Sequence, residues 1–165
     1  MTRGRGSALP LGAALGTLWM LLGLTAGTAQ APTAAPGEPE FVIIVNAANP
    51  IESLPAKTLS RMFLKKRKSW DDDVWGEKVK IEPFDLEERS DARRAFTRRI
   101  HDKSTGAIKS YWQREIFSGR ESSPLELESD EQMMERVASE KGAIGYVSGS
   151  AELIGNLKVL EVAEK

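Results

Sequence analysis

The residues best suited to chemistry in this sequence are a hydroxyl and the arginines around it, Arg89, Ser90, Arg93 and Arg94. Ser90 precedes a stretch with helical spacing, so it is the predicted N-cap of that helix. Unpaired backbone N–H groups and the helix dipole favour an anion at such a position, and an arginine can add bidentate hydrogen bonds. The alternative interpretation is structural: Ser90 only caps the helix, and Arg93 and Arg94 belong to a solvated face paired with glutamates.

Other kinds of active site find little support. His101 is the only histidine, and no serine or cysteine motif accompanies it. It lies near the predicted end of the same helix, where a cation is favoured. The sequence contains no glycine-rich nucleotide loop, no metal-spaced His/Cys cluster and no nucleophile elbow. We therefore predict that the protein is not an enzyme and needs no cofactor.

Three aspartates follow Trp70 and invite comparison with a calcium loop. Calcium loops carry oxygen ligands at alternating positions with a glycine at the turn. Here Asp71, Asp72 and Asp73 are consecutive and Val74 follows them. This pattern predicts a charged loop pinned by Trp70 rather than a metal site.

The composition is that of one ordinary globular domain. The 165 residues include 23 Lys and Arg, 24 Asp and Glu and 41% hydrophobic residues, with a formal charge of -1. A nucleic-acid binder would normally show a basic excess, so this partner class is not expected. The chain has no cysteine, so disulfides cannot staple it and its apolar core must hold the fold.

Residues 1–29 are predicted to be a signal peptide. A short positive region precedes an apolar run from Leu9 to Ala26, and small residues follow it. We predict cleavage after Ala29, because cleavage after Ala31 would leave Pro32 directly behind the cut. A transmembrane anchor is the alternative reading of the same run. A cleaved signal implies a secreted protein, most naturally in a periplasm.

Residues 30–40 are rich in proline, alanine and threonine and are predicted to form a linker. The folded domain is expected over residues 41–165. The apolar patterns predict strands at Phe41–Val45, Val79–Phe84, Ala143–Val147 and Leu157–Val162, and helices at Pro55–Phe63, Ser90–His101, Ser104–Gly119 and from Ser129 towards Gly142. The first strand is apolar throughout, as strands of parallel sheets are. The alternation predicts an α/β fold with a small mixed sheet flanked by helices.

Several segments, taken in order, resemble the second half of the phosphate ABC-transporter substrate-binding proteins, which have the type II periplasmic-binding fold. The matching segments are Val42–Asn46, Met62–Lys66, Trp70–Asp72, Ile81–Phe84, Ser90 with Phe96, and Gly142–Val147. The resemblance implies a single lobe of that fold and non-covalent recognition of a small oxyanion such as phosphate. Because that family closes two lobes on its anion, a clamp would require a homodimer or another protein.

The resemblance also implies a position for the oxyanion, with Ser90, Arg89 and Arg93 as its ligands. Ser90 stands at the family's serine and retains one hydroxyl of the pattern. Asp91 stands where the family has a glycine, and Leu86 where it has an arginine. The nearby arginines would then have to replace the missing one.

A second interpretation of the resemblance is a ligand-free periplasmic sensor or adaptor derived from the same lobe. Such a module would dock on a membrane transporter or sensor protein through its sheet edge or through the consecutive cations Lys65–Lys68. A solvated loop is the structural alternative for these cations.

Overall fold

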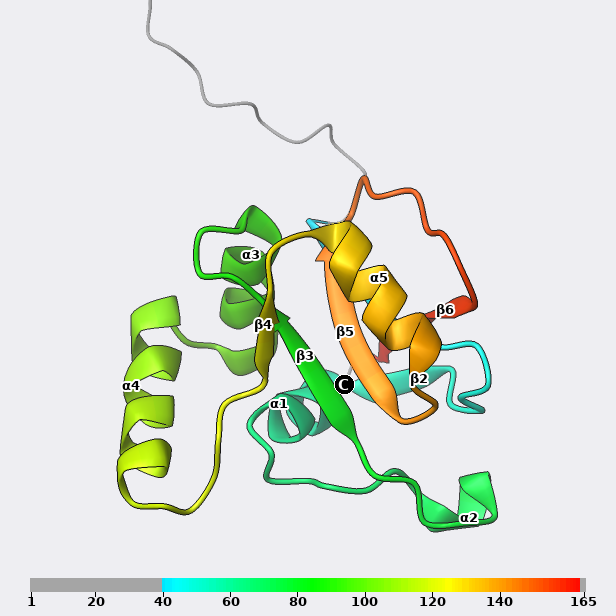
Figure 1. The fold of residues 1–165 in the computed structure, drawn as a ribbon, viewed down its shortest axis with the longest axis horizontal. Helices are drawn as coiled ribbons and strands as arrows, with labels where there is room; N and C mark the ends of the chain where they lie inside the picture. The colour runs from blue at the N-terminus through cyan, green and yellow to red at the C-terminus, as the bar shows by residue number, and fades with distance from the viewer. Residues whose placement is uncertain (1–39, 164–165) are drawn as a thin grey trace, which may run out of the picture. The chain divides into compact units, whose positions relative to one another are not determined.

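A six-stranded sheet lies at the centre of the fold, with helices on both faces (Figure 1). The computed structural model describes residues 40–163, so the predicted signal peptide and most of the linker lie outside the described residues. The elements in chain order are β1 (Phe41–Asn46), β2 (Ser53–Pro55), α1 (Ala56–Phe63), α2 (Asp72–Trp75), β3 (Glu82–Leu86), α3 (Asp91–His101), α4 (Thr105–Phe117), β4 (Leu125–Leu127), α5 (Asp130–Ser139), β5 (Ala143–Ser148) and β6 (Leu157–Ala163).

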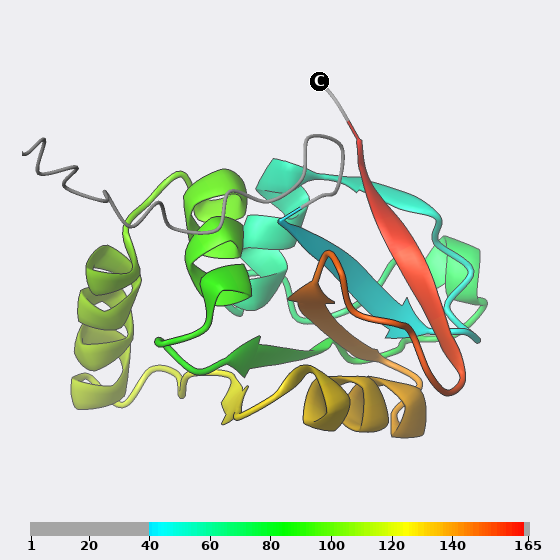
Figure 2. The same ribbon diagram turned by 90° about the horizontal axis from the view of Figure 1, so that it is seen from above.

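The sheet is mixed, with strand order β2-β6-β1-β5-β3-β4. Figure 2 shows α5 on one face and α1 and α3 on the other. Within residues 40–163, no helix combines the length and the apolar character that a membrane span requires.

Strand β1 is buried on both sides, as its continuous apolar run predicts, with Ile43, Ile44 and Val45 at most 1% exposed. The parallel arrangement expected from this run is wrong, because β1 pairs antiparallel with both β5 and β6. Parallel pairing occurs instead between β3 and its neighbours β4 and β5. Two-sided burial selects an apolar strand whatever the direction of its partners.

An aromatic cluster joins the sheet to the helices α1 and α3. The rings of Phe96 and Tyr146 stack with centroids 4.0 Å apart, and the centroids of Phe63 and Phe96 are 4.6 Å apart. Phe41 contacts the Phe96 ring edge-on at 5.6 Å. Aromatic pairs of this kind add to the free energy gained from burial. The cluster therefore fixes α3 against β1 and β5.

Trp70 anchors the loop that it was predicted to pin. Its side chain is 1% exposed, and its indole Nε1 donates to the carbonyl oxygen of Gly142 at 2.9 Å. The aspartates that follow begin the short helix α2, where Asp71 accepts a hydrogen bond from the backbone N–H of Asp73 at 3.2 Å. The sequence did not predict this helix, because four residues are too few to show helical periodicity.

The predicted helix starts are confirmed at three serines. Ser90, Ser104 and Ser129 each accept a hydrogen bond from the backbone N–H three residues later. The capping box at α5 differs in one detail, since Gln132 Oε1 accepts from the N–H of Glu128 rather than from that of Ser129. Strand β3 begins three residues later than predicted. Strands β2 and β4 were missed, because each has only three residues.

Candidate functional site

Ser90 begins α3, where its side chain acts as the N-cap. The Ser90 Oγ accepts from the Arg93 N–H at 3.3 Å, and the extended backbone of Ser90, with φ −66° and ψ 134°, is that of a cap. The N-cap predicted at Ser90 is thus confirmed. The cap also fixes Arg93 one turn into the helix.

Arg93 points into the protein rather than into solvent. The residue is 6% exposed, and its guanidinium forms an ion pair with Asp85, which is 4% exposed. Arg93 Nη1 also donates to the carbonyl oxygen of Leu86 at 3.2 Å. The interpretation of Arg93 as part of a solvated face is therefore wrong. Arg94 is exposed as that interpretation predicts, but its acidic partner is Asp91 rather than a glutamate.

Asp85, Arg93 and Tyr146 form a buried polar cluster. The Tyr146 hydroxyl donates to Asp85, and the backbone N–H of Leu86 donates to Asp85 Oδ1 at 3.1 Å. Burial is the main cause that raises the pKa of Tyr146, so its hydroxyl stays protonated and donates. The Arg93 Nε, however, is buried without a hydrogen-bond partner among residues 40–163. A buried donor of this kind costs free energy unless a water or a ligand accepts from it.

A cavity of about 240 Å³ lies beside this cluster, between the start of α3, the helix α4 and the edge strand β4. Two cations, Arg93 and Lys109, line it together with two carboxylates, Glu88 and Glu126. Lys109 Nζ lies 2.9 Å from Glu88 Oε2, and Arg93 Nη2 lies 3.9 Å from Glu126 Oε1. Thr105 also lines the cavity, and Trp112 and Ile116 add apolar surface. The cavity therefore has a mixed lining whose charges are balanced.

A family match that covers most of the chain identifies the family to which it belongs. Residues 39–162 match the family described as the PBP superfamily domain. The chain belongs to this family. No curated protein matches the chain.

Solved structures share the fold of this PBP-superfamily domain. An ABC-type phosphate transport receptor from Vibrio cholerae is similar with 24% identity and a TM-score of 0.54, over 73% of this chain and 45% of that chain. A Clostridium perfringens protein assigned as a phosphate ABC transporter substrate-binding protein, with bound phosphate, gives 17% identity and a TM-score of 0.57, over 74% of this chain and 44% of that one.

A protein from Planctomyces limnophilus DSM 3776 assigned to phosphate binding is also similar, with 20% identity and a TM-score of 0.55. The match covers 76% of this chain and 42% of that chain. The chain thus spans less than half the length of each of these proteins. The single-lobe α/β architecture predicted from the sequence is confirmed.

Arg89 lies apart from the cavity of the PBP-superfamily domain. Its side chain is 77% exposed, and its Nε lies 2.6 Å from Glu87 Oε2. Of the three residues predicted to bind an oxyanion, the structure brings Ser90 and Arg93 together through the cap. Arg89 instead faces solvent with an acidic partner.

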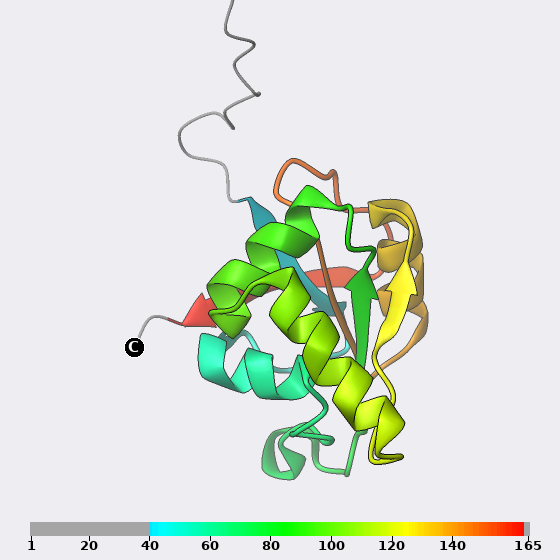
Figure 3. The ribbon, with the colours of Figure 1, turned by 90° about the vertical axis from the view of Figure 1, so that its left-hand side faces the viewer.

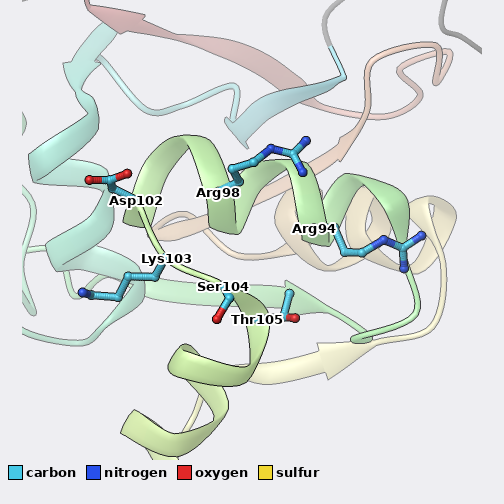
Figure 4. A pocket seen from close by; sticks show the side chains of 6 residues that line it. All are labelled: Arg94, Arg98, Asp102, Lys103, Ser104 and Thr105. Carbon is cyan, nitrogen blue, oxygen red and sulfur yellow. The ribbon is translucent and has the colours of Figure 1, made fainter.

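A wider hollow of about 480 Å³ lies where α3 leads into α4, and it carries arginines and hydroxyls (Figure 4). Figure 4 shows that its side chains diverge: Arg94 and Arg98 extend away from Ser104, and Lys103 points in another direction. Arg98 also has an acidic neighbour, with its Nη2 3.3 Å from Glu40 Oε2. The hollow therefore has cations on its rim but no convergent set of donors.

The buried face of α3 contains a polar stripe that the sequence analysis missed. Arg93, Thr97 and His101 recur every four residues and are at most 8% exposed. His101 Nδ1 lies 2.9 Å from Ser60 Oγ, and burial lowers the pKa of His101 to about 4, assisted by the positive charges of Arg93 and Lys103. His101 is therefore neutral at pH 7, and the cation expected at this helix end is wrong. The spacing of four residues between Arg93, Thr97 and His101 was the feature of the sequence that could have indicated one shared helix face.

Proposed function

We propose that this PBP-superfamily domain is an exported, non-enzymatic binding protein that recognises a small oxyanion of the phosphate class. The binding position would be the cavity between the start of α3, α4 and β4. The shared fold of three proteins named for phosphate transport or binding supports the ligand class, and the apolar run from Leu9 to Ala26 supports export.

One observation carries the proposal: the buried Arg93 Nε has no partner within residues 40–163, and Arg93 lines the cavity. An oxyanion oxygen would satisfy that donor with a charge-assisted hydrogen bond. Lys109 and Thr105 would add a second cation and a hydroxyl from α4. Ser90 then acts by capping α3 and holding Arg93, and Arg89 contributes a long-range positive charge.

The two carboxylates of the cavity limit the affinity. A bound oxyanion must separate Lys109 from Glu88 and approach Glu126, and like charges at short range repel. We therefore expect binding to weaken when a cation is removed and to strengthen when Glu126 is neutralised. This opposite response separates binding in the cavity from binding elsewhere on the surface.

The test is a titration of the full chain with phosphate, arsenate and sulfate, followed by Tm and by tryptophan fluorescence, to which Trp112 in the cavity lining contributes. A ligand that binds only the folded state raises Tm by mass action. We expect phosphate to raise Tm, Lys109→Gln to reduce the shift and Glu126→Gln to enlarge it. Arg98→Gln, in the wide hollow, is the matched control and should leave the shift unchanged. A Tm that responds to none of the three anions would contradict the proposal.

A second candidate is the ligand-free sensor or adaptor, and one observation favours it. The Asp85 carboxylate already neutralises the charge of the Arg93 guanidinium, so this buried pair needs no bound anion for charge balance. In that case no oxyanion stabilises the chain, and a membrane transporter or sensor protein is the expected partner.

If phosphate does bind, a homodimer that closes two lobes on it should become more stable with phosphate, which sedimentation velocity measures.

A further inference from the structure

The last turn of α4 presents apolar side chains that nothing covers within residues 40–163. Phe117 is 96% exposed and Ile116 is 54% exposed. The helix buries only Ile108 and Trp112, which both precede its last turn, so that turn is not needed to pack the core. In Figures 1 and 3 this end of α4 lies at the edge of the fold. Phe117 therefore projects from the end of the helix as the tip of this turn, and Ile116 lies between it and the 240 Å³ cavity, which Ile116 also lines.

Cations lie on the chain segments next to this tip, although Arg120 pairs with Glu115. The Lys65–Lys68 loop reaches the segment that follows α4, where Lys65 Nζ lies 3.4 Å from the Ser123 carbonyl oxygen and Lys68 pairs with Glu121. Lys66 Nζ lies 5.2 Å from the centre of the Tyr111 ring of α4. The two segments together, 65–68 and 114–121, carry six cations and two carboxylates: Lys65, Lys66, Arg67, Lys68, Arg114 and Arg120 against Glu115 and Glu121.

The combination of an apolar tip and nearby cations distinguishes among the partners that could bind this surface. A symmetric contact with a second copy would bring the two cationic surroundings together, which repulsion opposes. An anionic bilayer instead accepts an apolar tip below its headgroups and holds cations at its surface. The apolar run from Leu9 to Ala26 is predicted to be a signal peptide or an anchor, and either would bring the chain to a membrane.

We propose that the Phe117 tip, defined as Ile116 and Phe117 with the cations of segments 65–68 and 114–121, docks on an anionic phospholipid surface. Phe117 enters the region below the headgroups, and the lysines and arginines contact lipid phosphates. The tip adjoins the proposed oxyanion cavity, because Ile116 lines one side of that cavity, whereas Phe117 does not line it. Docking would hold the domain at a bilayer in a fixed orientation.

The experiment measures co-sedimentation of the full chain with vesicles of phosphatidylcholine alone and of phosphatidylcholine mixed with phosphatidylglycerol. Residues 1–39 are common to all variants, so differences between variants report on the tip. We expect Phe117→Ser to weaken binding to the anionic vesicles roughly tenfold, and Lys66→Gln to weaken it roughly fivefold. Ile154→Ser and Lys57→Gln change an exposed apolar residue and an exposed lysine outside the tip, and should leave binding unchanged.

Three outcomes would contradict the docking proposal. Equal binding of wild type and Phe117→Ser to the anionic vesicles would overturn the proposal, as would equal binding of wild type to both vesicle types. Self-association without lipid that Phe117→Ser abolishes would assign the tip to a second copy and also overturn it. Circular dichroism of each variant checks that the fold is retained, which is expected because Phe117 is exposed.

Discussion

Strand β5 and helix α3 both lie in the core of this domain, but different interactions hold them. Strand β5 is apolar and closely packed, with Ala143, Ile144 and Val147 fully buried. Helix α3 buries an arginine, a threonine and a histidine on the same side that contacts its neighbours. The strand therefore depends mainly on shape, whereas the helix depends on charge pairing and protonation as well as on its aromatic contacts. The difference teaches that substitutions in the two elements should destabilise the fold in different ways.

Removing the partner of Arg93 tests the dependence of α3 on charge pairing and should have the largest effect. Asp85→Asn leaves a buried guanidinium without its carboxylate, and such a loss costs about 3–5 kcal/mol of unfolding free energy. Urea denaturation followed by circular dichroism measures it. Asp91→Asn breaks the exposed pair with Arg94 and should cost below about 1 kcal/mol. Similar losses in both variants would show that burial of the pair has no special weight.

A second prediction concerns how His101 makes the stability of the domain depend on pH. Its pKa is about 4 in the folded protein and near 6.5 when unfolded, so the unfolded chain binds more protons between these values. Stability contributed by the neutral ring is complete above about pH 6.5 and is lost as pH falls towards 4, by up to about 3 kcal/mol. The difference in Tm between pH 7 and pH 4.5 should therefore be larger for wild type than for His101→Gln. An identical pH dependence would remove His101 from the account.

Crowding at the start of β5 tests the dependence of the strand on shape. A Cβ at Gly142 would lie 2.0 Å from the Lys80 carbonyl oxygen, which is backbone and cannot move aside freely. Gly142→Ala should therefore destabilise the fold by about 1–3 kcal/mol. Gly106→Ala, in α4, meets open space and should be neutral or stabilising, since alanine is the better helix former. A pH-independent loss at Gly142, measured by urea denaturation at two pH values, would sharpen the contrast with His101.

The cap of α3 gives the smallest expected effect. Ser90→Ala removes the acceptor for the Arg93 N–H and should cost about 1 kcal/mol. Ser104→Ala removes the equivalent cap of α4 and should cost a similar amount. Thermal denaturation compares the two. A clearly larger loss at Ser90 would mean that its cap also supports the Asp85–Arg93 pair.

Local patterns predicted most of the frame. The spacing of apolar residues located α1, α3, α4, α5, β1, β5 and β6, and the serine caps were predicted to the residue. The boundaries of β3 and the elements of three or four residues were missed, because such short segments are stabilised by neighbours rather than by their own periodicity. The direction of β1 was wrong for a related reason, since burial on both sides does not encode the direction of the adjacent strands.

The sequence by itself determined the longer elements, the caps and the resemblance to one lobe of a phosphate-binding fold, because each depends on residues close together in the chain. Only the tertiary structure decided that Arg93 faces Asp85, eight positions earlier on another element, and that Arg89 pairs with Glu87 outside the cavity. It likewise decided that Trp70 binds the Gly142 carbonyl oxygen and that His101 is buried and neutral. These contacts join separate elements, and the side of a helix that the core covers depends on how those elements pack.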